Sequence, residues 1–361
     1  MHGHRIHIPR LPTLVDVAAK AGVSRATVSR VLNMYPHVRP EVRQRVLKAI
    51  RTLRYRPDRV AQSLARRETR TIGLIVADIT NPFYAETAKA NVETARGRGY
   101  TVVLCNTENL PRLQAEQIDL LRQQRVDGII LGSVHLQDPP VEELVATGFP
   151  CVMYNRRLRS GAGNYVVLDN VRGAEEVTRH FIALGHRRIA FLAGPRSFST
   201  ANERLAGYRR ALRAAGIPWD PRLVRQGQFQ AGLAFQAAVD LLKGSPRPTA
   251  VVAGNDLTAL AVLDAATDLG LQVPGDLAVS GFDDTDIARH RTIQLTTVAQ
   301  QKAEMGRLAV TYLLECIQDP ERFRRDPIRH ILPPTLVVRR SCGTVVGSGQ
   351  IGRSSAGATR R

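Results

Sequence analysis

The chain has 361 residues, of which 43% are hydrophobic, 51 are Lys or Arg and 32 are Asp or Glu. This length exceeds the ~150 residues of a typical domain, so we expect more than one folded unit and exclude wholesale disorder. No apolar run approaches the ~20 residues that a membrane span needs, and residues 1–12 contain no apolar signal segment. We therefore expect a cytoplasmic protein with no membrane contact and a disordered basic leader over residues 1–12.

Positive charge is concentrated at the N-terminal end. Residues 1–70 have 16 basic and 4 acidic side chains, whereas residues 71–338 have 30 and 28. Residues 339–361 add five Arg and no acid, and we expect residues 341–361 to form a flexible basic tail. A codon bias toward Arg explains why Lys is rare, but not why acidic residues avoid the head. A basic head on a nearly neutral body is typical of a nucleic-acid-binding module fused to a separate domain.

Residues 13–33 predict two short helices joined by a tight turn. Thr13 and Asp16 form a T-x-x-D capping sequence ahead of an apolar stripe at helical spacing. Gly22 interrupts the stripe, and Ser24 can cap a second helix. Two short amphipathic helices around such a turn predict a helix-turn-helix, whose second helix enters the DNA major groove. The expected inward positions are Leu14, Val17, Ala18 and Ala21, then Val28, Val31 and Leu32.

Polar side chains on the second helix must face outward once these apolar positions turn inward. Arg can donate two hydrogen bonds to guanine, Ala can contact a thymine methyl, and Ser or Asn can bond a phosphate or a base edge. The candidate DNA-binding residues here are Ser24, Arg25, Ala26, Thr27, Ser29, Arg30 and Asn33. A third helix follows, with Val42, Val46, Ile50 and Leu53 on its apolar face. A plain helical hairpin is the alternative interpretation.

A further short helix is expected after Tyr55-Arg-Pro-Asp58. About nine residues is below the ~12–15 that stay helical alone in water, so this helix should order only when it is docked.

The head resembles the lactose-repressor family of bacterial transcription regulators. The resemblance rests on Thr13-Leu-Val-Asp-Val-Ala-Ala-Lys-Ala-Gly-Val-Ser-Arg-Ala-Thr-Val-Ser-Arg-Val-Leu-Asn33 and on Tyr55-Arg-Pro-Asp-Arg-Val-Ala-Gln-Ser-Leu64, and the similarity continues to about Arg340. It implies a helix-turn-helix domain over 13–57, a hinge helix and linker over 58–70, and an effector-binding and dimerisation domain over 71–340.

The same resemblance implies a homodimer on double-stranded, pseudo-palindromic operator DNA. The helix over 24–33 would lie in the major groove, and the hinge would fold in the minor groove with Leu64 as an apolar wedge. By position, His37, Arg43 and Tyr55 would contact or support the phosphate backbone.

Two residues depart from the family pattern. Arg39 replaces the Ser or Thr that often caps the third helix, which would fray that helix or add a phosphate contact. Asp58 replaces the usual Asn and brings a negative charge near DNA, although it suits a helix N-terminus.

From Thr71 the chain alternates short apolar runs with helical stretches. Because the runs are continuously apolar, we expect parallel strands covered on both faces by helices. The predicted fold is thus an all-α head plus an α/β body of two doubly wound lobes, for which the resemblance implies the architecture of periplasmic sugar-binding proteins. The expected strands are 72–77, 101–106, 127–131, 151–155, 165–168, 189–193, 250–254 and 277–282.

Polar residues recur at the carboxyl ends of these strands, where ligands bind in such sheets. Carboxylates, amides and a multidentate Arg suit paired sugar hydroxyls, and an aromatic ring can cover an apolar sugar face. The candidate effector-binding residues are Asp78, Phe83, Asn155, Arg204, Phe229, Asn255 and Asp283. Ordinary loop and capping chemistry is the alternative for each residue alone. Lys302, where the family has an aromatic wall residue, suggests an acidic effector.

The sequence therefore predicts a transcriptional repressor that is controlled by a small polar effector such as a sugar. Control by a purine or a protein corepressor, or a sugar carrier sharing only the body fold, remain as alternatives. We expect no enzyme, because Asp283-Asp284 lacks a nucleophile or a paired His. No cofactor or metal is expected, since the Gly347–Gly352 G-x-G-x-x-G sequence lacks its βαβ context and the four Cys lack CxxC spacing. We expect the four Cys to be buried as small hydrophobes.

Overall fold

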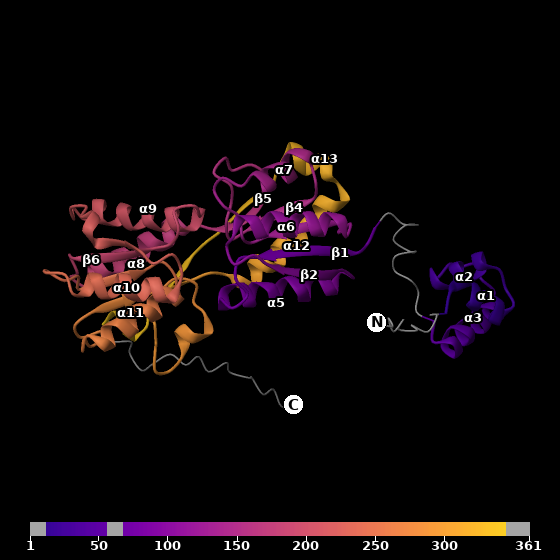
Figure 1. Ribbon diagram of the computed structural model, residues 1–361, viewed down its shortest axis with the longest axis horizontal. Coiled ribbons are helices and arrows are strands. Elements are labelled where there is room, and N and C mark those ends of the chain that lie inside the picture. The colour runs from indigo at the N-terminus through magenta and orange to yellow at the C-terminus, as the bar shows by residue number, and fades with distance from the viewer. Residues whose placement is uncertain (1–11, 56–67, 344–361) are drawn as a thin grey trace, which may run out of the picture. The chain divides into compact units, whose positions relative to one another are not determined.

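The computed structural model describes residues 12–55 and 68–343, which divide into two compact units at Thr69 and Arg70 (Figure 1). The predicted leader, the hinge helix with Asp58 and Leu64, and most of the C-terminal tail lie outside the described residues. We describe the two units separately.

The head consists of three helices: α1 (Leu14–Ala21), α2 (Arg25–Leu32) and α3 (Pro40–Leu53). The predicted capping box is present, since Thr13 Oγ1 accepts from the Asp16 amide and Asp16 Oδ2 accepts from the Thr13 amide. Gly22 ends α1 in the left-handed conformation that favours glycine, with φ of 63°. The apolar faces meet in one small core, listed by its buried members: Val17, Ala18, Ala21, Val28, Val31, Val46, Ala49 and Tyr55.

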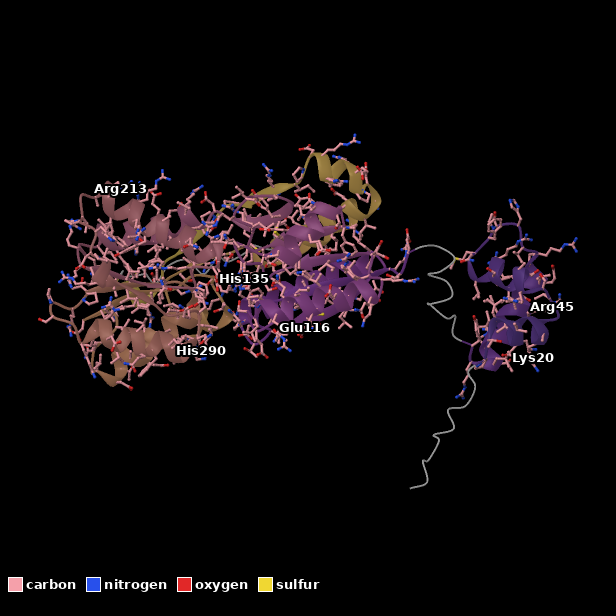
Figure 2. The ribbon with its side chains drawn as sticks, turned by 45° about the horizontal axis from the view of Figure 1, so that its top comes forward. Lys20, Arg45, Glu116, His135, Arg213 and His290 are labelled. Carbon is pink, nitrogen blue, oxygen red and sulfur yellow. The ribbon has the colours of Figure 1, made fainter. Side chains whose placement is uncertain are left out.

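The start of α3 does not fray at Arg39. Arg39 makes no side-chain capping hydrogen bond, but Pro40 occupies the first helical position, where its fixed φ and missing N–H suit a helix start. Several basic side chains of the head are exposed, and Lys20 and Arg45 project from it (Figure 2).

The first lobe is built on a six-stranded parallel sheet of order β11-β5-β4-β3-β1-β2. Its strands are β1 (Thr71–Val76), β2 (Thr101–Asn106), β3 (Gly128–Leu131), β4 (Cys151–Tyr154), β5 (Asn164–Leu168) and β11 (Arg329–Leu332). Its helices are α5 (Pro82–Gly97), α6 (Pro111–Gln123), α7 (Pro139–Thr147), α12 (Lys302–Gln318) and α13 (Pro320–Arg325). Buried apolar side chains lie on both faces of this sheet.

The second lobe has a four-stranded parallel sheet of order β7-β6-β8-β9. Its strands are β6 (Ile189–Ala193), β7 (Val224–Gln226), β8 (Ala250–Ala253) and β9 (Ala278–Ser280), and its helices are α8 (Asn170–Ala183), α9 (Ser199–Ala214), α10 (Ala231–Leu242) and α11 (Asp256–Asp268). Short 3₁₀ turns cover Pro221–Leu223, Asp286–Arg289 and Arg340–Cys342. An antiparallel pair, β10 (Thr297–Ala299) and β12 (Thr335–Val337), lies beside this lobe.

The chain passes between the lobes after β5, after β10 and after β11. This connectivity confirms the predicted pair of doubly wound lobes with repeated crossings. It also brings the carboxyl ends of both sheets toward the connecting segments.

All eight predicted strands are present, but one expectation about them is wrong. The outer strand β2 is not covered on both faces, because it lies at the sheet edge and Leu104 is 45% exposed. The strands β7, β10, β11 and β12 were not predicted, since each has only three or four residues and no continuous apolar run. The four cysteines are free and buried, as expected.

Candidate functional sites

The outward face of α2 is polar and accessible. Arg25, Ala26 and Arg30 are exposed, and none of them contributes to the head core. Ser24 faces the start of the helix, where its hydroxyl accepts from the Thr27 amide at 3.2 Å and lies 2.9 Å from the Thr27 hydroxyl. Ser24 therefore caps α2, with the Thr27 amide as the donor, and Ser24 itself stays exposed.

The C-terminal end of α2 and the following loop carry the other polar candidates. Asn33 Nδ2 donates to Ser29 Oγ at 3.3 Å along the same helix face. Arg43 on α3 donates to the Tyr35 carbonyl at 2.7 Å, so it fixes the loop between the two helices. His37 lies exposed in this loop. Tyr55, by contrast, is 7% exposed and packs inside the head core.

The body contains one pocket that collects residues from both lobes. All seven effector candidates line it: Asp78, Phe83, Asn155, Arg204, Phe229, Asn255 and Asp283. Sequence reasoning missed the other lining residues, which are Asn81, Tyr84, Asn109, Arg156, Thr200 and Gln300. The strand-end rule could have found Asn109, Arg156 and Asn81, since each follows a strand by a few residues.

The first lobe supplies a rigid polar wall. Asp78 follows β1, and its Oδ1 accepts from both the amide and the hydroxyl of Thr80. Asn155 follows β4 in a left-handed conformation, with φ of 63°, and its Nδ2 donates to the Tyr84 hydroxyl at 3.2 Å. Tyr84 in turn donates to the Gly132 carbonyl. This chain of hydrogen bonds fixes Asn155 at the pocket wall.

The second lobe supplies a buried charged pair. Arg204 is 4% exposed, donates to Asn170 Oδ1 and to the Gly254 carbonyl, and lies 3.6 Å from Asp283 Oδ1. Gln300 Nε2 also donates to Asp283, at 2.6 Å. Burial lowers the pKa of Arg204, and the carboxylate of Asp283 counteracts that shift. Hydrogen bonds to Asn170, Gly254 and Gln300 thus fix Arg204 and Asp283 in place.

Asn255 and Asp256 begin α11 beside this pair. Asn255 Oδ1 accepts from the Thr258 amide at 2.9 Å, so Asn255 is both a helix cap and a pocket residue. Asp256 is fully buried and accepts from the amide and hydroxyl of Thr285. Burial, reinforced by the nearby Asp283 carboxylate, raises the pKa of Asp256 to about 7.

Phe229 is one of the residues that line the pocket. Its ring stacks on Phe198 at 6.5 Å between centroids and lies against Gly194 and Gly254, where a Cβ atom would meet the ring. Gln228 and Phe229 both have positive φ, at 53° and 56°, which is a strained conformation for residues with a side chain. The space left among the lining side chains is about 40 Å³. Typical ligand pockets measure ~300–1,000 Å³, so a bound molecule requires Phe229 or the lobes to move.

Lys302 does not face this pocket, and the expectation that its ammonium would bind an acidic effector is wrong. Its Nζ donates to the carbonyls of Asp283 and Asp284, at 2.8 and 2.6 Å, and lies 3.2 Å from Glu86 Oε2. Glu86 on α5 already neutralises the ammonium. Together these contacts connect α5 and α12 to the loop after β9.

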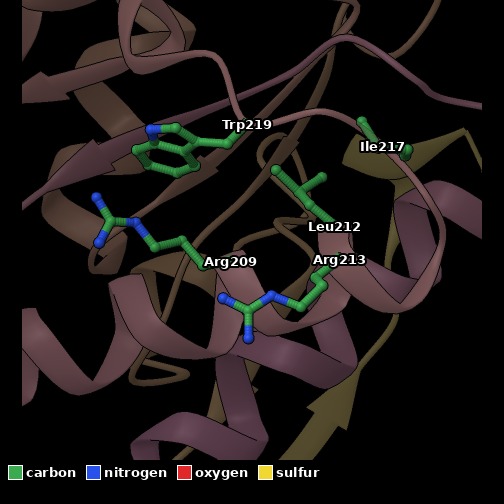
Figure 3. A pocket seen from close by; sticks show the side chains of 5 residues that line it. All are labelled: Arg209, Leu212, Arg213, Ile217 and Trp219. Carbon is green, nitrogen blue, oxygen red and sulfur yellow. The ribbon is translucent and has the colours of Figure 1, made fainter.

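A larger cavity of about 400 Å³ lies against the C-terminal half of α9 (Figure 3). It is lined by Arg209, Leu212, Arg213, Ile217 and Trp219, and the Arg209 guanidinium lies 4.0 Å from the centre of the Trp219 ring. It contains none of the predicted effector residues. The smaller pocket, and not this larger cavity, is the one that brings the predicted polar side chains together.

Within residues 12–55 and 68–343, no helix is long and apolar enough to cross a membrane. The same part of the chain contains no group of three or more His, Cys, Asp or Glu side chains that could hold a metal ion.

Comparison with known proteins gives consistent matches for both units. The family model "Bacterial regulatory proteins, lacI family" matches residues 13–58, and the model "Periplasmic binding protein-like domain" matches residues 178–342. The HTH-type transcriptional regulator DegA of Bacillus subtilis (strain 168) is 36% identical over 332 residues, covering 91% of this chain and 97% of that protein.

Two solved structures match nearly the whole chain. One is a complex of the transcriptional regulator CelR with cellobiose, 37% identical with a TM-score of 0.70, covering 91% of this chain and 99% of that one. The other is a lac repressor dimer bound to operator and an anti-inducer, 32% identical with a TM-score of 0.83, covering 92% and 99%. The chain therefore belongs to the LacI family of bacterial regulatory proteins and is a DNA-binding transcriptional regulator.

Proposed function

We propose that this regulator represses its target genes by binding operator DNA through α2, and that a small polar effector of the carbohydrate class controls this binding from the pocket between the lobes. The observation that carries the proposal is the convergence of all seven effector candidates on one pocket. A structure of the related CelR with cellobiose supports the carbohydrate class.

The contacts of the head support distinct roles for its residues. Arg25, Ala26 and Arg30 read base edges, because they are exposed on the helix that enters the major groove. Ser24, Thr27, Ser29 and Asn33 bond phosphates or base edges at the two ends of that face. His37 and Arg43 contact or position the phosphate backbone, and the buried Tyr55 supports the head core. Leu64 acts as the minor-groove wedge, although it lies outside the described residues.

Control by the effector follows from the position of the pocket. Arg204, Asn255 and Asp283 belong to the second lobe, whereas Asp78, Phe83 and Asn155 belong to the first, so one ligand contacts both lobes. Binding then changes the relative angle of the lobes, and a change in the first lobe acts on the predicted hinge, residues 58–70, that precedes it. A coupling free energy of ~1–3 kcal/mol between two such sites is typical.

Two copies of the chain form the operator-binding unit. Apolar side chains are exposed on the neighbouring elements α5 and β2, where Val92 is 42% and Leu104 45% exposed. The lac repressor, which matches 92% of this chain, is a dimer on its operator. We assign this face to the homodimer interface, and sedimentation of Leu104→Glu as a monomer would test the assignment.

We assign the protein to the bacterial cytoplasm, because its operator lies there, and we assign it no catalytic activity. The adjacent carboxylates of Asp283 and Asp284 are held by internal partners. Asp284 accepts from Arg339 at 2.6 Å and from Arg289 at 3.0 Å, and Asp283 accepts from Gln300. These bonds account for both carboxylates without a catalytic role, and Asp283 also lines the proposed effector pocket.

The test uses operator fragments selected from random DNA by the full-length protein, with binding followed by fluorescence anisotropy. Arg25→Ala should lose operator affinity and keep every effector-induced shift in melting temperature. Asn255→Ala should keep operator affinity and lose the effector-induced shift in melting temperature. If both variants lose both activities, or if operator affinity is insensitive to salt, the assignment of the two sites is wrong.

A further inference from the structure

The pocket contains two buried arginines whose surroundings differ. Arg156 and Arg204 are each 4% exposed and line the same space. Arg204 has an acidic neighbour in Asp283, and the adjacent Arg157 pairs with Glu203 at 2.7 Å. Among the described residues, no carboxylate lies within 4.0 Å of the Arg156 guanidinium, the distance that defines an ion pair here.

The partners that Arg156 does have are neutral. Its Nη1 donates to Asn109 Oδ1 at 2.9 Å, and its guanidinium carbon lies 3.5 Å from the centre of the Phe198 ring and 6.0 Å from that of Tyr84. Its Nε is buried without a hydrogen-bond partner. A free donor on a buried cation is costly unless something else satisfies it.

The electrostatics agree with this geometry. Burial lowers the pKa of Arg156, and only the hydroxyls of Tyr84 and Tyr154 counteract the shift. Burial raises the pKa of both tyrosines, so they are neutral near pH 7. Arg156 therefore retains its positive charge, because an arginine pKa lies far above neutrality, and no group of the protein cancels it.

We propose that Arg156 binds an anionic group of the effector, a carboxylate or a phosphate, and that the effector is thus a hydroxylated anion such as a sugar acid or a sugar phosphate. The inference rests on the proposed function, since it uses the same pocket. A planar guanidinium with a free Nε–H suits an anion with two or three oxygens, and charge-assisted hydrogen bonds of this kind are the strong ones.

The rest of the pocket suits the hydroxyls of such a molecule. Gln300 is 6% exposed, donates to Asp283 and keeps a buried Oε1 without a partner, which can accept from a ligand hydroxyl. Asp78 uses Oδ1 for Thr80 and provides a further acceptor. Arg156 also connects the lobes, because it follows β4 of the first lobe and stacks on Phe198, which precedes α9 of the second. An anion on Arg156 is therefore placed where the two lobes meet.

The test compares the full-length protein with Arg156→Gln and with the matched control Arg112→Gln, whose side chain is 88% exposed and pairs only with Glu116. Melting temperature and titration calorimetry are measured with matched ligand sets: glucose, gluconate and glucose 6-phosphate; ribose and ribose 5-phosphate; and inorganic phosphate alone. We expect an anionic member to stabilise the wild type and the control while its neutral counterpart does not. Arg156→Gln should lose about tenfold or more in affinity for that anion. The gluconate and phosphate arms distinguish a carboxylate from a phosphate.

A second readout separates binding from structure. Without ligand, Arg156→Gln should melt at the same temperature as the wild type or higher, because it removes a buried charge that nothing compensates. A purely structural arginine would lower the melting temperature on removal.

Three results would overturn the inference. In the first, a neutral sugar or a purine binds equally well to the wild type and to Arg156→Gln. In the second, Arg156→Gln without ligand melts well below the wild type. In the third, the wild type and Arg156→Gln respond identically to all the anions. None of these affects the pocket assignment, which fails separately if Asn255→Ala leaves every ligand response unchanged.

Discussion

The proposed DNA-binding face and the proposed effector pocket place their residues in opposite environments. The candidates on α2 and at its ends come from one stretch of ten residues, 24–33, and all are exposed except the half-buried Thr27 and Ser29. The pocket residues are mostly buried, come from segments between Asp78 and Gln300, and are hydrogen-bonded to the protein itself. Substitutions of exposed residues on α2, such as Arg25, should therefore change binding alone, whereas substitution of a pocket residue that is paired within the protein, such as Arg204, should change binding and stability together.

The largest expected effect is the loss of Arg204. Arg204→Met leaves Asp283 buried without its cation, and breaking a buried pair in this way typically costs ~3–5 kcal/mol of unfolding free energy. Urea denaturation of the body measures it. Arg210→Met on the same helix, whose side chain is 68% exposed, is the control and should change little. Equal losses of unfolding free energy in Arg204→Met and Arg210→Met would show that the buried pocket arginine contributes no more to stability than an exposed one.

The second effect is on DNA affinity. Arg25→Ala should weaken operator binding by ~1–3 kcal/mol, the usual discrimination from one bidentate contact, with no change in melting temperature. Anisotropy against the selected operator and against a random fragment checks both specificity and affinity. A fall in stability together with affinity would show that Arg25 also supports the head.

A third effect concerns pH. Because burial raises the pKa of Asp256 to about 7 from an ordinary 3.8, the folded protein binds this proton more tightly than the unfolded chain does. The Asp256 contribution to stability is thus fully present below about pH 4 and is lost as the pH rises through about 7. Asp256→Asn should flatten the stability profile between these values. An unchanged profile in the variant would show that Asp256 titrates normally.

The smallest expected effect is at the head's capping box. Thr13→Ala should cost ~1 kcal/mol, because it leaves the first amides of α1 without a side-chain acceptor. Thermal unfolding of the head detects it, with Thr52→Ala on the exposed surface of α3 as the control. A loss of several kcal/mol would mean that Thr13 packs into the core as well as capping the helix.

The same contrast explains what could be predicted from the sequence. The head follows from local signals: Thr13 with Asp16, Gly22 and Ser24 each act within a few residues, so their roles are visible in the chain order. The pocket candidates Asp78, Asn155, Asn255 and Asp283 could be found because parallel strands all end at the same edge of a sheet.

The features that could not be predicted from the sequence depend on contacts between residues that are far apart along the chain. Lys302 and Arg156 are both cations near the predicted site, and the sequence offered only the first as an anion binder. The fold places Lys302 against two carbonyls and Glu86, and leaves Arg156 with neutral neighbours. The short strands β7 and β10 were missed for the same reason, since only their partners across the sheet make three residues a strand.

If the pocket binds the effector as proposed, the strained segment at Gln228 and Phe229 is expected to limit how tightly the effector binds. With Phe229 seated against Gly194 and Gly254, the described state has little room for a ligand, so we expect binding to draw on molecules in which the ring or the lobes have moved. The apparent dissociation constant is the intrinsic one divided by the fraction of molecules in that open state. Phe229→Ala removes the ring that takes up space, which should raise affinity, and also removes an aromatic wall, which should lower it. The net change in affinity measures which of these two effects is larger. We therefore expect the regulator's sensitivity to its effector to depend on this single apolar side chain as well as on the polar residues of the pocket.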